Sequence, residues 1–143
     1  MNASFCEAST KWGESLGAMA AQESALDSAS RDVEDPTDPT AVGMIHQIGS
    51  DLLAQASTAQ AYADVMVANT TDQEVIDAIA QVNLATIDVA LAMGEDAKDA
   101  EDLTAFAEAL AADVEVFKTM AEVDIVSAMT VISEYAEPFC NPS

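Results

Sequence analysis

The sequence predicts an all-α protein, a single-domain antiparallel up-down-up-down four-helix bundle whose ends are joined by a disulfide between Cys6 and Cys140. Three observations predict it. The composition is 50% hydrophobic but only 5% aromatic, rich in alanine and poor in glycine and proline, which favours helices over strands. Apolar residues recur at helical spacing in four stretches. The connections between these stretches are short, as they are between antiparallel neighbours.

The first helix is expected over residues 4–33. Its apolar positions are spaced by three and four residues, which places them on one helical face: Phe5, Ala8, Trp12, Leu16, Met19, Leu26, Ala29 and Val33. The segment RDVEDPTDPT follows, with two prolines and four acidic residues in ten positions. Such a segment cannot continue a helix, so we expect a turn there.

The second helix is expected over 39–68, because Asp38 followed by Pro39 suits an N-cap with proline at the first helical position. The third is expected over 72–93. It opens at Thr71-Asp72-Gln73-Glu74, which fits the capping-box pattern, and Gly94 suits the position just after its end. The fourth is expected over 100–136, with Pro138 ending it. Residues 1–143 are enough for one domain with one core.

The two cysteines lie at opposite ends of the chain. In an up-down-up-down bundle the start of the first helix and the end of the fourth lie together, so Cys6 and Cys140 are expected to form a disulfide. Such a long loop removes on the order of 4–5 kcal/mol of unfolded-state entropy in the chain-entropy model. Disulfides persist in oxidising compartments, so we expect a secreted or cell-envelope protein whose signal peptide is absent from this chain. The alternative is two unrelated thiols buried as small hydrophobes.

The charge is strongly one-sided, with 26 acidic residues, four basic ones and a net charge of -22. Nucleic-acid binding needs a basic face, so we expect no nucleic-acid partner. No run of 18 consecutive apolar residues is present, so no membrane insertion is expected. The expected partners are a basic protein, a basic peptide or a cation, bound by a monomer or weak homodimer. Solubility in a salty or extracellular medium is the other explanation for the charge.

Enzymatic chemistry finds little support in the sequence. His46 is the only histidine, and the expected topology places it far from both cysteines. No Gly-x-Ser-x-Gly elbow and no glycine-rich phosphate loop is present. The Glu-x-x-His pairs of di-metal carboxylate bundles are also missing, since Gly43 stands three residues before the histidine. We therefore expect a protein that is not an enzyme, with no cofactor in its main function.

A metal- or haem-binding bundle is the alternative function. Counting along the expected helices brings four carboxylates to about one level, where they could bind a divalent cation through oxygen: Glu23, Asp51, Asp88 and Asp124. The other interpretation is that these are solvated side chains. Haem could use His46 as an axial ligand, with Met44 as a nearby methionine. A histidine on an amphipathic helix is otherwise an ordinary polar residue.

Four aromatic residues are expected near the disulfide: Phe5, Trp12, Tyr135 and Phe139. They could form an aromatic plug in the core, or an apolar mouth for a small ligand between helix ends. The sequence leaves both interpretations open. The function expected overall is a non-enzymatic, secreted or cell-envelope binding or interaction protein with a strongly acidic surface.

Overall fold

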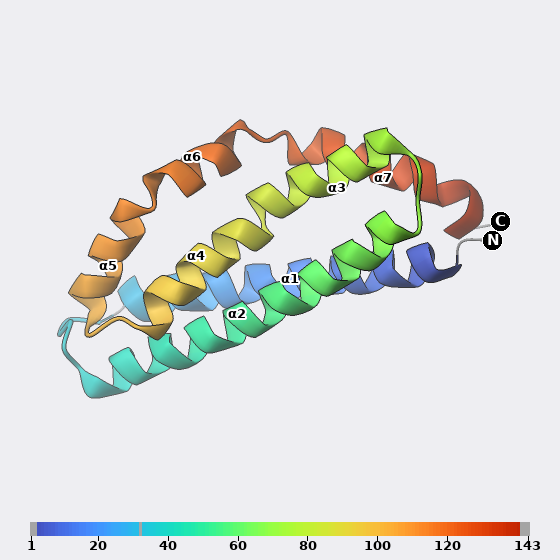
Figure 1. Cartoon of the computed structure of the whole chain (residues 1–143). Helices are drawn as coiled ribbons and strands as arrows, with labels where there is room; N and C mark the ends of the chain where they lie inside the picture. The colour runs from blue at the N-terminus through green and yellow to red at the C-terminus, as the bar shows by residue number, and fades with distance from the viewer. Residues whose placement is uncertain (1–2, 32, 141–143) are drawn as a thin grey trace.

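The computed structural model describes residues 3–31 and 33–140, and within these residues it is an all-α single domain without strands. The chain runs back and forth along one long axis (Figure 1). Seven helices follow one another in the described residues: α1 Ala3–Arg31, α2 Pro39–Ala68, α3 Gln73–Ala85, α4 Ile87–Lys98, α5 Leu103–Ala112, α6 Val114–Glu122 and α7 Ile125–Cys140.

The two longest helices, α1 and α2, lie side by side and form the most extensive helix pair of the domain (Figure 1). The observed α2 has the bounds expected from the sequence, 39–68. Asp38 caps it by accepting a hydrogen bond from the Thr40 N–H at 3.0 Å, and Pro39 begins the helix. The expected first helix reached residue 33, but Val33 lies outside α1, in the connection that contains Pro36 and leads to α2.

The expected third helix, 72–93, is corrected in two ways. Its cap is Asp72, whose carboxylate accepts from the N–H groups of Glu74 at 3.0 Å and Val75 at 3.3 Å. It is also divided into α3 and α4 at Thr86, whose hydroxyl donates to the Val82 carbonyl at 2.6 Å. Such a bond can bend a helix, but Thr58 makes the same bond inside the unbroken α2, so it does not by itself produce the break.

Gly94 lies inside α4 and does not end a helix, contrary to the expectation. It contacts Gly49 of α2, where the two helices approach closely: a methyl group added at Gly49 would lie 2.8 Å from the Ala97 Cβ and 2.8 Å from the Lys98 backbone nitrogen. Glycine is needed here for its missing side chain. The helix therefore continues past Gly94 to Lys98.

The expected fourth helix, 100–136, is three helices in the structure. Asp113 separates α5 from α6, and Val123 and Asp124 separate α6 from α7. A side-chain hydrogen bond stabilises the start of α7, where Asp124 accepts from the Ser127 N–H at 3.0 Å. Pro138 does not end α7, which continues to Cys140. A proline in the last turn removes one backbone hydrogen bond, and the helix end is held by the disulfide.

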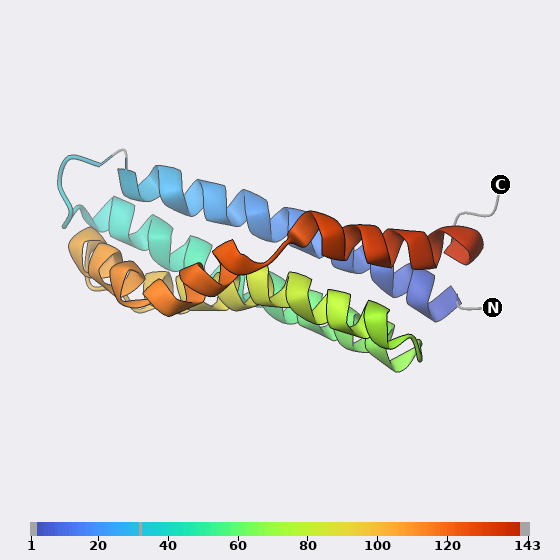
Figure 2. The ribbon, with the colours of Figure 1, turned by 90° about the horizontal axis from the view of Figure 1, so that it is seen from above.

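Cys6 and Cys140 are bonded to each other, with their Cα atoms 5.3 Å apart, which confirms the predicted disulfide. Both described chain ends therefore lie at one end of the domain (Figure 2). A disulfide is consistent with an oxidising, extracytoplasmic location.

The core is formed mainly where α1 packs on α2, α2 on α4, and α3 on α7. Its largest fully buried side chains come from four of these helices and from α5, among them Trp12, Leu26, Ile45, Ile79, Ile87 and Phe106. The contact between α1 and α7 is small in comparison.

One helical stretch among the described residues, Gln73–Lys98, is long and apolar enough to cross a membrane by length and composition, with a mean hydropathy of 1.6. Asp77 and Asp88 interrupt it, so a search for consecutive apolar residues passes over it. This stretch is α3 and α4, which pack on α2 and α7. Interior helices of globular domains meet the same criteria, and 44% of the most apolar 18-residue window of this stretch is buried in the domain.

Candidate binding groove at the disulfide-linked end

A groove of about 360 Å³ lies between α1 and α7, beside the disulfide. Thr10, Trp12 and Gly13 line it from α1, and Met129, Ile132 and Glu137 line it from α7. Its size is in the range of small-ligand pockets. The groove exists because the disulfide holds the two helices together at one end while few contacts join them elsewhere.

Glycine keeps the α1 wall of the groove low. A methyl group added at Gly13 would meet no atom within 4 Å, and the same is true one turn further at Gly17. An α1 side chain at either position would project into open space. Glycine in a helix interior lowers the stability of the helix by about 0.5–1 kcal/mol relative to alanine. At these two positions it leaves the surface of α1 open instead.

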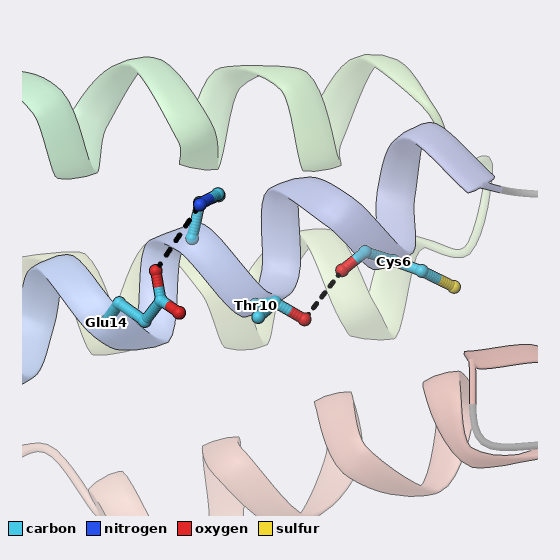
Figure 3. A network of polar contacts seen from close by, with 4 residues as sticks. Cys6, Thr10 and Glu14 are labelled. Atoms are coloured by element: carbon cyan, nitrogen blue, oxygen red, sulfur yellow. Dashed lines mark hydrogen bonds and ion pairs between the residues drawn. The ribbon is translucent and has the colours of Figure 1, made fainter.

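Polar groups near the groove are arranged so that its charge is negative. The Thr10 hydroxyl donates to the Cys6 carbonyl at 3.1 Å, as Figure 3 shows. Lys11 is paired with Glu14 at 3.7 Å on the exposed surface and does not line the groove. Glu137 is the one ionisable group among the described lining residues, apart from the bonded cysteines. A cationic group placed in the groove would therefore meet a carboxylate and no competing base.

Three of the four aromatic residues singled out in the sequence form a packed cluster. Phe5 is fully buried, and its ring centroid lies 5.1 Å from that of Tyr135 and 6.1 Å from that of Phe139, in edge-to-face geometry. The Tyr135 hydroxyl accepts a hydrogen bond from Thr70 at 2.8 Å. These three rings fill the core beside the disulfide and do not line the groove.

Trp12 has a different place. It is 1% exposed, and its indole N–H donates to the Asn83 side chain of α3 at 3.2 Å. It also forms the floor of the groove. A polar partner at one edge and packing around the ring fix the position of the indole, so an almost fully buried aromatic ring lies beneath the groove.

The four carboxylates expected at one level are not brought together. Within the described part of the chain no group of three or more histidine, cysteine, aspartate or glutamate side chains is close enough to hold a metal ion. Burial raises the pKa of Glu23 on α1 and that of Asp88 on α4. Asp51 is exposed on α2.

The position of Asp124 explains in part why the four carboxylates do not lie together. The expected position was inside a long fourth helix, but the residue lies at the start of α7. Hydrogen bonds from the backbone and then the side chain of Ser127 lower the pKa of Asp124. Its carboxylate therefore serves as a helix cap and is directed at its own chain.

His46 joins two parts of the backbone. Its Nε2 lies 2.5 Å from the carbonyl oxygen of Ala100, in the connection between α4 and α5. Met44 is two residues away on the same helix and 52% exposed. Residues two apart do not share a helix face, so the two side chains are not placed to bind one iron.

The groove itself is not predicted by the sequence, although Trp12 is among the four aromatic residues that the sequence places near the disulfide. The glycines at 13 and 17, in the middle of an apolar helix face pattern, were the available signal. Comparisons with protein-family models, with curated proteins and with solved structures give no match. Function is therefore inferred from the groove and the charge.

Proposed function

We propose that this protein is a non-enzymatic, extracytoplasmic binding or interaction module. Its architecture is proposed as an antiparallel four-helix bundle, in which α3 and α4 together form the third arm and α5, α6 and α7 the fourth. The reversals of chain direction and the joined ends support this arrangement. The binding unit is one chain, because both walls of the groove belong to it.

The groove between α1 and α7 is the observation that carries the proposal. We assign to it a lysine or arginine side chain of a basic partner polypeptide. The floor and one wall are apolar, from Trp12, Met129 and Ile132, and suit the aliphatic stem of such a side chain. Glu137 offers a carboxylate to its charged head, and charge-assisted hydrogen bonds are the stronger ones.

The net charge of the chain supports the same class of partner. At -22, the protein attracts basic polypeptides over a distance of about one Debye length, ~8 Å at physiological salt. This attraction is general and raises the rate of encounter. The groove adds the specific part, because it combines apolar lining side chains with the carboxylate of Glu137.

The test separates the two contributions with a pair of glycine variants. Gly13→Leu places a side chain in the groove, whereas Gly43→Leu makes the same change on α2, where an added methyl also meets nothing within 4 Å. A fluorescent lysine-rich peptide is titrated into each protein at physiological salt. We expect Gly13→Leu to lower the affinity about tenfold, equivalent to ~1.4 kcal/mol, and Gly43→Leu to leave it unchanged.

Glu137→Gln provides a second variant that keeps the shape of the groove. It should weaken binding and reduce the salt dependence, because one charge pair is lost. Equal affinity of the wild type, Gly13→Leu and Glu137→Gln would mean that the peptide binds the acidic surface in general, and the groove would lose its proposed role.

A further inference from the structure

Two carboxyl groups far from the groove, those of Asp96 and Asp113, lie close enough to share a hydrogen bond. Asp96 belongs to α4, and Asp113 lies at the break between α5 and α6. One side-chain oxygen of each, Oδ2, is closed off from solvent, and no hydrogen-bond donor of the described protein reaches it. A buried carboxylate oxygen without a donor is unfavourable, because its interaction with water is lost and not replaced.

Asp113 is unusual among the aspartates at helix starts. Asp38, Asp72 and Asp102 each accept a backbone N–H of the helix they begin. Asp113 begins α6 but makes no such side-chain bond. Its carboxyl group is placed against Asp96 instead, so it joins the α5–α6 connection to α4.

Two carboxyl groups at hydrogen-bonding distance cannot both be ionised without strong repulsion. A single proton shared between them removes the repulsion. It also supplies the missing donor, because a protonated carboxyl donates to a carboxylate in a short, charge-assisted bond. When the two carboxyl groups share one proton, the pair holds α5 and α6 on α4. When both groups are ionised, their repulsion pushes α5 and α6 away from α4.

The segment that the pair would release is weakly held. The described α6 contains no fully buried residue. Its apolar side chains Val116, Phe117 and Met120 are half-buried, and Val114 is 59% exposed. Elements with few buried apolar contacts open at low free energy.

We propose that Asp96 and Asp113 form a proton-dependent latch, which keeps the α5–α6 segment closed on α4 in acidic medium and lets it open as the pH rises to neutral.

The direction follows from linkage. Burial first, then the hydrogen bond with Asp113 and the charges of Asp113 and Glu95, raise the pKa of Asp96 to about 7. A closed state with a raised carboxyl pKa binds more protons than an open state with the ordinary value near 3.9. Stability of the closed state is therefore full at low pH and falls as the pH rises between about 4 and about 7.

Other charged groups near the pair either raise the pKa of Asp96 as well, as carboxylates do, or are exposed to solvent. Glu95 is paired with Lys98 at 3.7 Å, and Asp99 and Glu101 line the same side of α4 and α5. His46 of α2 is hydrogen-bonded to the Ala100 carbonyl. The remaining charged residues of the surrounding helices are exposed or half-buried: Glu23, Asp51, Asp77, Asp88, Glu108, Glu115, Lys118 and Glu122.

Hydrogen–deuterium exchange between pH 5 and pH 8, corrected for the intrinsic rate at each pH, tests the latch. In the wild type, the opening constant of amides in Leu103–Glu122 should rise by up to about tenfold per pH unit until about pH 7. Asp96→Asn should abolish this rise, because the amide donates to Asp113 at every pH. Asp99→Asn removes the same charge from the same helix end and should behave like the wild type.

A pH-independent opening constant in the wild type would overturn the latch, and so would an unchanged pH profile in Asp96→Asn. Asp113→Asn provides the reciprocal variant should Asp96→Asn fail to fold, and it should also lose the pH profile. Amides of α1 and α2 report whether the effect is confined to the segment. A parallel pH response throughout the domain would indicate general charge repulsion and contradict the latch.

Discussion

At the scale of single residues, glycine has two opposite uses in this domain. Gly13 lies where an added side chain meets nothing, and Gly49 lies where one would collide with a neighbouring helix. The missing side chain at Gly13 leaves the surface of α1 open to solvent, whereas the missing side chain at Gly49 lets α2 and α4 approach each other closely. Sequence alone does not distinguish them, because both stand inside an apolar helical pattern and their neighbours across the interface decide the outcome.

Gly49→Ala is expected to destabilise the protein by about 1–3 kcal/mol, as overpacking does in cores. The new methyl would lie 2.8 Å from the backbone nitrogen of Lys98, which cannot move without shifting α4. Gly43→Ala is the control and should stabilise the protein by about 0.5–1 kcal/mol, because its site is open and alanine favours a helix. Urea unfolding monitored by circular dichroism measures both changes. A neutral Gly49→Ala would contradict the close approach of the two helices.

At the scale of elements, local capping chemistry decides where helices begin. Asp38 and Pro39 were sufficient to predict the start of α2, and the observed bounds agree. The breaks at Thr86 and Asp113 were not predicted, because the apolar periodicity continues across both of them. A back-bonded hydroxyl stands at the first break, and an aspartate that interacts with Asp96 of α4 stands at the second. Both depend on contacts that a one-dimensional pattern does not contain.

The start of α3 gives a test at this scale. Asp72→Ala should lower the free energy of unfolding by about 1 kcal/mol, the usual cost of losing an N-cap. Thr71→Ala should have little effect, since the threonine next to the cap does not bond to the helix start, although the sequence pattern favoured it. Chemical denaturation of the two variants compares them. A larger loss of stability in Thr71→Ala than in Asp72→Ala would support the capping box predicted from the sequence and contradict the Asp72 cap.

At the scale of the whole molecule, the disulfide closes the chain and shapes the groove. It joins residues separated by 134 positions, which constrains the unfolded chain by on the order of 4–5 kcal/mol in the entropy model. The sequence was sufficient to predict this bond, because only two cysteines and one topology were involved. The groove beside it was not predicted, since it depends on how far α7 diverges from α1 along its length.

Alkylation of the protein under denaturing, non-reducing conditions, followed by mass measurement and peptide mapping, is the most direct test of the closed chain. The expected result is no alkylation, an intact mass two hydrogens below that of the reduced chain, and a linked peptide pair containing Cys6 and Cys140. Alkylation of both cysteines in protein purified without reductant would contradict the closed chain, and with it the proposed groove and the extracytoplasmic location.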